Sequence, residues 1–492
     1  MRRKLQAVLL SIVMLFVVSK LAIVGIPPTW AQTAEQAKQA DRLVDSIGVN
    51  THFGYHNVYS SDYQGLKSKL GKLAVRHIRD GVNSINGPRI RELYKLYGIR
   101  LTAIAGRRVD GSYDKPLELN AIDDELTDIK KYALAATEAI EGPNEYDISH
   151  GSDSDWVSRI RRYQKLLYSK VKSDTLLKNR PILGPSLTSE EAYKKVGDLT
   201  SIINYTNAHP YAGGRNPGTK GWGDNGYGSL PWVFQYNTRR QSASKPPQFT
   251  ECGYHNAVNS DSGHVGTSET AVGKYMSRMF AEYFRHGVGR AFLYELVDEG
   301  TDPNHLEDRF GLLRNDLTEK PAYRSLRNTI DLLKDPGSSF KPGSLTYSLS
   351  GDLRDIHRLL LQKRDGSFYL VIWQEVPSFD VDSKKDLSPT ARSLTLKLGT
   401  KISTAETYLP LNSTSKLNRY TSPRSIPLKV PDHLLIVKLV PATVGALPTP
   451  EPTLAAQEPQ ATAYEHTGFH TSSPSFFTII NRVVFFCFSL AY

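Results

Sequence analysis

The sequence is poor in cysteine and lacks the short motifs of several large enzyme classes. Its 492 residues include only two cysteines, Cys252 and Cys487, which are too few for a disulfide framework or a cysteine-ligated zinc site. It contains neither the Gly-x-Ser-x-Gly motif of α/β-hydrolases nor the His-Glu-x-x-His motif of zinc proteases. No glycine-rich phosphate turn follows the first expected strand, which ends in Asn50-Thr51-His52. We therefore expect no metal and no cofactor, and we interpret Cys252 as a small packing residue.

The charge of the chain is basic but spread out. There are 61 Lys and Arg against 50 Asp and Glu, which gives a net charge of +11. The basic residues are scattered along expected surface helices, as at Arg161-Arg162 and Lys170. The basic, aromatic-interleaved strand pair typical of RNA-binding domains is missing from the sequence. We expect no nucleic-acid partner, and we interpret the charge as a solvated surface or as attraction to an acidic polysaccharide or cell wall.

The N-terminal residues 1–31 have the pattern of a targeting segment. Three basic residues at positions 2–4 precede an apolar run over 5–18, and Thr29-Trp30-Ala31 offers a small-residue cleavage site. The pattern predicts a secretory signal, or an uncleaved membrane anchor if Lys20 is tolerated within a longer apolar stretch. Either alternative predicts a secreted or cell-envelope protein whose main body lies outside the cytoplasm.

The middle of the chain, residues 45–335, alternates strand-like and helix-like segments. Between the strands lie amphipathic runs with apolar residues three and four positions apart. Eight strands are expected, at residues 47–53, 74–80, 99–105, 139–145, 181–187, 202–211, 247–251 and 290–295. Eight such units predict an α/β fold of the (β/α)₈ TIM-barrel type. An open doubly wound sheet is the rival, and it usually carries fewer strands and a glycine-rich turn.

The pattern changes after the barrel. Residues 340–442 contain short strand-like runs, with the hairpin signal Asp365-Gly366 between two of them, and predict a small antiparallel β-sandwich. Residues 443–475 are rich in Pro, Ala and Thr, a composition typical of a disordered linker. Residues 476–492 are apolar, and either a short membrane anchor or a stray terminus fits them. Membrane association through either end therefore stays open.

Two glutamates stand where strands of the predicted barrel end. Glu145 closes Gly142-Pro143-Asn144-Glu145, and Glu251 closes Phe249-Thr250-Glu251. In a parallel barrel the carboxyl ends of the strands meet at one face, where active sites are built. A pair of carboxylates facing one pocket is what hydrolysis of a glycosidic bond requires.

These motifs resemble the retaining glycoside hydrolase superfamily known as clan A. The resemblance covers about residues 45–335 and rests on Asn144-Glu145, on Thr250-Glu251 and on His209-Pro210-Tyr211 at the sixth strand end. It implies that Glu145 is the acid/base, that Glu251 is the nucleophile, and that Asn144 binds the 2-hydroxyl of the attacked sugar. It also implies a carbohydrate substrate with an O-glycosidic, β-type linkage.

Further site residues follow from the same comparison. Tyr211 is expected to donate a hydrogen bond to Glu251, and an arginine is expected near the nucleophile, with Arg79 preferred over Arg76. His52 either binds sugar hydroxyls or is structural. Many clan members carry a tryptophan platform at the eighth strand end, where this chain has Tyr294 followed by Glu295. The remaining candidates are His209, on the same strand face as Tyr211, and Trp222 and Trp232, each either a stacking surface or core.

Two other functions stay open. The first is a catalytically inactive barrel that binds carbohydrate at the cell surface. The second is a transglycosylase that remodels envelope glycans with the same two glutamates. Acids near Asp302 and Asp308 do not have the spacing of an EF-hand calcium loop. We expect a monomer.

Overall fold

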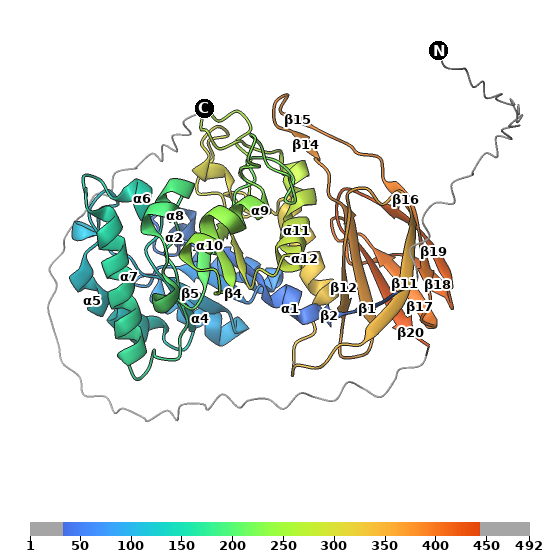
Figure 1. The fold of residues 1–492 in the computed structure, drawn as a ribbon, viewed down its shortest axis with the longest axis horizontal. Coiled ribbons are helices and arrows are strands. Elements are labelled where there is room, and N and C mark those ends of the chain that lie inside the picture. The colour runs from blue at the N-terminus through green and yellow to red at the C-terminus, as the bar shows by residue number, and fades with distance from the viewer. Residues whose placement is uncertain (1–32, 443–492) are drawn as a thin grey trace, which may run out of the picture.

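The computed structural model describes residues 33–442, which form a barrel and a β-sandwich side by side (Figure 1). The predicted targeting segment 1–31, linker 443–475 and apolar tail 476–492 lie outside the described residues. Across residues 33–442, no helix has both the length and the apolar character needed to cross a bilayer.

The first body is a closed parallel barrel. Its strands run in the order β7-β6-β5-β4-β3-β10-β9-β8, and a parallel bridge between Leu183 and Tyr205 joins the two edges. The strands are β3 (Ile47–Asn50), β4 (His77–Asp80), β5 (Arg100–Ile104), β6 (Thr137–Glu141), β7 (Ile182–Leu183), β8 (Thr206–Ala208), β9 (Pro247–Cys252) and β10 (Ala291–Leu293). Each lies within or next to a predicted segment, and the predicted (β/α)₈ barrel is confirmed.

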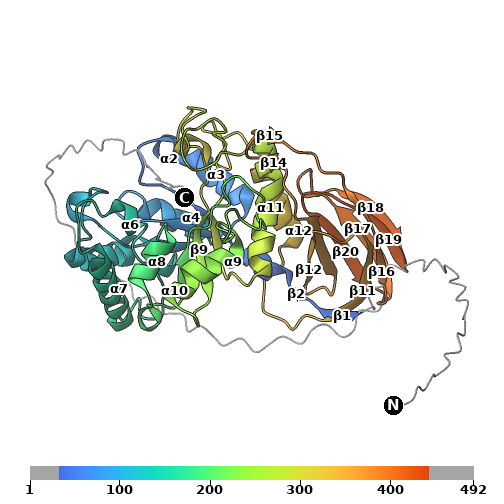
Figure 2. The same cartoon turned by 45° about the horizontal axis from the view of Figure 1, so that its top comes forward.

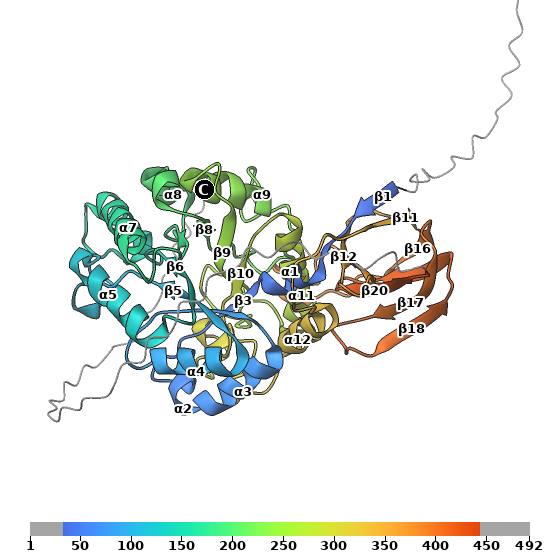
Figure 3. The same cartoon turned by 90° about the horizontal axis from the view of Figure 1, so that it is seen from below.

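Helices surround the strands, as Figure 3 shows from below. They are α1 (Ala40–Asp45), α2 (Val58–Ser61), α3 (Tyr63–Leu73), α4 (Gly87–Tyr97), α5 (Ile122–Asp128), α6 (Tyr146–Ser149), α7 (Trp156–Ser173), α8 (Glu190–Val196), α9 (Leu230–Val233), α10 (Arg239–Gln241), α11 (Glu269–Arg285) and α12 (Pro321–Leu333). In α7 the buried residues Ile160, Tyr163, Leu167 and Val171 recur at three- and four-residue spacing and pack on the barrel. Helix α4 ends at Gly98, whose φ of 68° lies in the left-handed region.

The second body is a β-sandwich of two antiparallel-rich sheets. One sheet has the order β1-β11-β16-β19 and the other β18-β17-β20-β13-β12-β2. Their strands are β1 (Thr33–Gln36), β2 (Lys38–Gln39), β11 (Ser344–Gly351), β12 (Ile356–Gln362), β13 (Phe368–Gln374), β16 (Arg392–Leu398), β17 (Ile402–Tyr408), β18 (Lys416–Thr421), β19 (Ser425–Val430) and β20 (Leu435–Pro441), with a separate ribbon of β14 (Phe379–Asp380) and β15 (Lys385–Asp386). The predicted sandwich is confirmed.

The sandwich also takes two strands from before the barrel. Thr33 of β1 is paired with Tyr347 of β11, and Lys38 of β2 is paired with Leu361 of β12. These strands lie outside the predicted sandwich range 340–442. Along the described chain, two strands of the sandwich therefore come first, the barrel follows, and the remaining strands of the sandwich come last.

A buried ion pair joins the two bodies. Arg278 on α11 lies 2.7 Å from Oε1 of Glu375, which follows β13, and both side chains are at most 2% exposed. The indole nitrogen of Trp373 donates to Oε2 of the same carboxylate over 2.8 Å. Helices α11 and α12 lie against the sandwich strands in both Figure 1 and Figure 2. The sandwich is therefore fixed to the barrel by specific, desolvated contacts.

Candidate active site

Arg79 is the hub of the site at the carboxyl ends of the strands. It is the third residue of β4, and its side chain is 2% exposed. Its Nε and Nη2 lie 2.6 and 2.9 Å from the two carboxylate oxygens of Glu141. Its Nη1 donates to Oε1 of Glu251 over 2.8 Å and to Asn50 over 2.9 Å. Its Nη2 also donates to Oδ1 of Asn144 over 2.7 Å. One guanidinium thus holds residues from β3, β6 and β9.

Glu251 is held in its ionised form. Its Oε2 accepts a hydrogen bond of 2.9 Å from the hydroxyl of Tyr211, and Nδ1 of His209 lies 3.5 Å from the same oxygen. Burial by itself would raise the pKa of Glu251, but the charges of His209 and Arg79 and the Tyr211 donor outweigh it and lower that pKa. The carboxylate is therefore a partly buried anion with fixed orientation.

Glu145 lies beyond the strand rather than at its end. Strand β6 finishes at Glu141, and Glu145 precedes α6 with a φ of 41°. This left-handed backbone is uncommon for residues other than glycine. Oε1 of Glu145 lies 2.8 Å from Nδ1 of His209. One oxygen of Glu145 and one oxygen of Glu251 lie no more than 4.8 Å apart, and a ring nitrogen of His209 lies within 4.8 Å of both.

The hydrogen bonds around Thr250 fix which ring nitrogen of His209 carries a proton. The Thr250 hydroxyl lies 2.9 Å from Oε1 of Glu141 and 2.9 Å from Oδ1 of Asn207. That Asn207 oxygen already accepts from the Thr250 amide, while its Nδ2 donates to Glu141. Both neighbours of the hydroxyl are therefore acceptors, so Nε2 of His209, 2.9 Å away, donates to the Thr250 oxygen. Nδ1 is left to share one proton with Glu145.

The charge state of His209 depends on the two glutamates. Burial opposes its positive form, but the negative charges of Glu251 and Glu145 outweigh burial and raise its pKa above the ordinary value of 6.5. The three facing atoms of Glu145, His209 and Glu251 also have the spacing of a metal site. Because Glu145 is already hydrogen-bonded to His209, and because Arg79 supplies positive charge to Glu251, proton sharing is the better description of this cluster.

Two residues that support the site carried no predicted role. Glu141 is fully buried and anchors Arg79, and in the sequence it reads as one more acid near Glu145. Asp80 accepts from the hydroxyl of Thr51 over 2.9 Å and from the amide of Phe53 over 3.0 Å, which fixes the turn that carries His52. Both are the last residue of a barrel strand, and an acidic residue at that position is the signal that the sequence offers for both.

The other candidates divide into two regions. His52 lies against Tyr294, with ring centroids 5.5 Å apart, and its Nε2 is 3.5 Å from Oε2 of the fully buried Glu295. That oxygen also accepts from the hydroxyl of Tyr59 over 2.8 Å. Arg76, the alternative to Arg79, instead forms an ion pair with Asp41 at 2.7 Å, away from Glu251.

Trp222 and Trp232 belong to an aromatic series after β8. The Trp222 ring is 5.1 Å from Tyr227, which is 4.4 Å from Trp232. Trp232 is 5% exposed and packs in the core, whereas Trp222 is half-buried on a glycine-rich loop. Glu375 of the sandwich accepts from Asn216 over 2.7 Å and from the Gly218 amide over 2.8 Å. The sandwich therefore holds the loop that carries Trp222.

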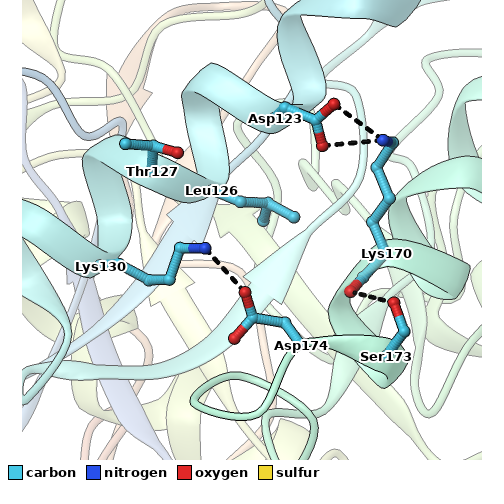
Figure 4. A pocket seen from close by; sticks show the side chains of 7 residues that line it. All are labelled: Asp123, Leu126, Thr127, Lys130, Lys170, Ser173 and Asp174. Carbon is cyan, nitrogen blue, oxygen red and sulfur yellow. Dashed lines mark hydrogen bonds and ion pairs between the residues drawn. The ribbon is translucent and has the colours of Figure 1, made fainter.

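A surface pocket between α5 and α7 lies apart from this site (Figure 4). Its charged side chains bind each other: Lys170 lies 2.7 Å from Asp123, and Lys130 lies 2.7 Å from Asp174. Because these exposed pairs are mutually satisfied, the pocket offers no group poised for chemistry.

The fold matches solved structures of glycoside hydrolases. A family 39 glycoside hydrolase from Bacteroides cellulosilyticus superposes with a TM-score of 0.58 at 16% identity, over 83% of both chains. This chain therefore shares its fold with a family 39 glycoside hydrolase. A monomeric β-xylosidase from Caulobacter crescentus gives a TM-score of 0.52 at 14% identity, over 84% of this chain and 100% of that one. A glucosidase from Croceicoccus marinus gives 0.53 at 10% identity, over 83% and 98%.

At such identities the likeness concerns the fold. No protein-family model and no curated protein matches the sequence. The predicted resemblance to clan A is therefore confirmed at the level of architecture, and the chemistry must be argued from the residues themselves.

Proposed function

We propose that the protein is a retaining glycoside hydrolase that cleaves O-glycosidic bonds of an oligo- or polysaccharide by double displacement. The observation that carries the proposal is the approach of one oxygen of Glu145 to one oxygen of Glu251 within 4.8 Å. Retaining enzymes place their two carboxyl groups about 5–5.5 Å apart, whereas inverting enzymes need about 6.5–9.5 Å to admit a water molecule. The spacing supports direct attack by one carboxylate.

Glu251 is the nucleophile in this proposal. Its pKa is lowered and its orientation is fixed by Arg79 and Tyr211, so it is ionised and aimed at the anomeric carbon. In the first step a Glu251 oxygen bonds to that carbon while the bond to the leaving oxygen breaks. In the second step water attacks the same carbon and releases the Glu251 carboxylate, so the configuration is retained.

Glu145 supplies and recovers the proton. In the first step it donates a proton to the leaving oxygen, and in the second it accepts one from the attacking water. The 2.8 Å contact with His209, whose Nε2 is already a donor to Thr250, gives Glu145 a partner that shares this proton. Asn144 is oriented for the sugar: its Oδ1 accepts from Arg79 and Ser186. Among residues 33–442, no group accepts a hydrogen bond from its Nδ2, which is therefore available to the 2-hydroxyl.

The test uses a 2-deoxy-2-fluoro glycoside panel with good leaving groups, followed by peptide mass spectrometry. We expect a covalent ester on Glu251, and we expect Glu251→Gln to lose both labelling and turnover. For Glu145→Ala with a substrate whose leaving group needs no protonation, added azide should restore turnover: it attacks the anomeric carbon of the ester on Glu251, frees the carboxylate and gives a glycosyl azide of retained configuration. Tight glycan binding without labelling would favour the inactive binding barrel, and transfer to added acceptor sugars would favour the transglycosylase.

We propose further that the enzyme acts outside the cytoplasm. The support is the basic and apolar pattern of residues 1–31 in the sequence. Fractionation of the producing cells with an antibody against the barrel tests this, and a purely cytoplasmic signal would contradict it.

A further inference from the structure

Three carboxylates without a positive partner stand beside the catalytic pair. They belong to Glu295, Glu299 and Glu307, in the segment after β10. Among residues 33–442, no lysine or arginine lies within ion-pair distance of any of them. The nearest basic side chain of another kind is His52, whose Nε2 is 3.5 Å from Oε2 of Glu295. By contrast, Asp298 in the same segment is neutralised by Lys320 at 2.7 Å. Within the described part of the chain, this group of carboxyl groups therefore has no lysine or arginine partner.

Glu295 is the member of the group whose burial is least favourable in free energy. Its side chain is fully buried, its Oε2 accepts from Tyr59, and its Oε1 has no hydrogen-bond partner. Nε2 of His52 is likewise buried and without a hydrogen-bond partner. Burial of an unsatisfied carboxylate oxygen is strongly unfavourable unless a ligand completes its bonding. Oε1 of Glu295 and Nε2 of His52 therefore indicate that a ligand with hydrogen-bond donors occupies this place.

The geometry suits an ammonium group. One ring nitrogen of His52 and one oxygen each of Glu295 and Glu299 lie within 4.8 Å of one another. A nitrogen at the centre of such a triangle is within about 2.8 Å of each corner, which is the length of a charge-assisted hydrogen bond. A zinc ion would bind the same ligands at about 2.0–2.2 Å, and the 3.5 Å between Nε2 of His52 and Oε2 of Glu295 is compatible with that, so a metal is the alternative occupant that the experiment below tests. Burial lowers the pKa of His52 to about 4, so its ring is neutral and can accept.

The group lies within reach of a bound sugar. Tyr294, whose ring contacts His52, donates to Oε2 of Glu307 over 3.0 Å. Glu307 in turn feels the negative charges of Glu251 and Glu145. His52 follows β3 and Glu295 follows β10. These two strands are neighbours in the barrel, and β6 lies several strands away from both. A sugar that spans the mouth can therefore contact both Asn144 and the acidic group.

We propose that His52, Glu295 and Glu299 form a binding site for the protonated amine of an amino sugar, with the amine on a carbon remote from the one that Asn144 contacts. The inference rests on the proposed glycosidase function and names its substrate class. Three acceptors match the three N–H donors of a primary ammonium group, and the negative charge that the carboxyl groups take on when a cation binds favours it over a hydroxyl or an acetamide.

The titration of the group supports this assignment. Burial, and then the nearby carboxylates of Glu307 and Asp308, raise the pKa of Glu299 to about 8. Burial also raises the pKa of Glu307 to about 7, with Glu251 and Glu145 adding to the effect. A bound cation favours the ionised carboxylates, so binding should release protons near neutral pH.

The test is calorimetric titration of the full chain with methyl β-glycosides of glucose, galactose and mannose. Each is used in its parent form and with one hydroxyl at C2, C3, C4 or C6 replaced by an amine. We expect an amine at C3, C4 or C6 to bind about tenfold tighter than the parent, with release of protons and with weakening at high salt. Equal affinities throughout the panel, or a preference confined to C2 amines, would overturn the proposal.

Two variants locate the effect. Glu299→Gln should abolish the preference for the amine, while Glu191→Gln, which removes the same charge from the exposed surface of α8, should leave it intact. Tight binding of Zn²⁺ or Mn²⁺ that is lost in Glu299→Gln, with no preference for amines, would assign the site to a metal instead. The hydrolase proposal is tested separately: selective amine binding without fluoro-sugar labelling of Glu251 would remove that proposal and leave the cation site standing.

Discussion

Nη1 of Arg79 lies 2.8 Å from Oε1 of Glu251, and the same guanidinium binds both oxygens of Glu141. One cation is thus divided between a supporting carboxylate and the proposed nucleophile. The remaining negative charge of the centre is balanced by His209, whose pKa the glutamates raise. The centre is therefore a linked set of charges, in which removal of one member affects the others.

Substitution of Arg79 should destabilise the fold as well as remove activity. Arg79→Gln leaves Glu141 and Glu251 buried without their counter-ion, which costs about 3–5 kcal/mol. Arg76→Gln breaks a half-exposed pair with Asp41 and should cost at most about 1 kcal/mol. Urea denaturation of the two variants measures the difference. Equal destabilisation by both would contradict the central role of Arg79.

Loss of the Tyr211 hydroxyl should shift the pH–rate profile. Tyr211→Phe keeps the ring but removes a donor that favours the charged form of Glu251, so the pKa of Glu251 rises. The acidic limb of kcat/KM should therefore move to higher pH, with a fall in kcat of about tenfold or more. Tyr323→Phe, whose hydroxyl binds the Lys69 carbonyl, is the matched control. An unshifted limb in Tyr211→Phe would argue against the contact.

His209 should stabilise the fold most at mildly acidic pH. Its folded pKa is raised above 6.5, so its contribution is fully present below that value and is lost as the pH rises through the folded pKa. The free energy of unfolding lost in His209→Gln should accordingly be largest near about pH 6 and shrink toward about pH 9. Denaturation curves of wild type and variant across this range provide the measurement, and a difference that grows with pH would refute the assignment.

The link between sandwich and barrel should control both stability and substrate contact. Glu375→Gln replaces one carboxylate oxygen with an amide that faces the donors of Arg278 and Trp373, at a cost of about 3–5 kcal/mol. Because Glu375 also holds Asn216 and Gly218, we expect KM for longer glycans to rise more than kcat falls. Kinetics with substrates of increasing length check this. A change confined to kcat would show that the loop is held by other contacts.

Much of the barrel could be predicted because its signals are local. Most residues of the eight short strands are buried, and the helices between them carry regular apolar stripes. In the sandwich, β17, β18 and β19 were not predicted. For β18 the reason is that its residues are mostly polar and exposed, whereas the alternating burial of β17 and β19 is a strand signal that was overlooked. Strands β1 and β2 were not predicted either, because they are short, polar and paired with partners about three hundred positions away.

The site was predictable where residue type alone specifies chemistry. Glu251 stands within its strand, as the sequence pattern indicates, but Glu145 lies four positions past β6 on a left-handed residue that no periodicity predicts. Whether Nε2 of His209 donates or accepts depends on Thr250 and Asn207. It is therefore decided by contacts between three strands, which the sequence does not show. The placement of Glu299 beside His52 likewise depends on the path of a loop. The individual sequence predictions for the site stay predictions until the labelling and variant experiments are done.

The order of the two bodies along the chain has a practical consequence. Since β1 and β2 complete the sheets that β11 and β12 begin, the barrel is inserted in a domain whose pieces flank it. A fragment cut at the boundary near residue 340 would yield a barrel with two orphaned strands and a sandwich with two exposed sheet edges. Domain-swap or crystallisation fragments should therefore keep residues 33–442 together, and the two bodies should melt in one cooperative transition.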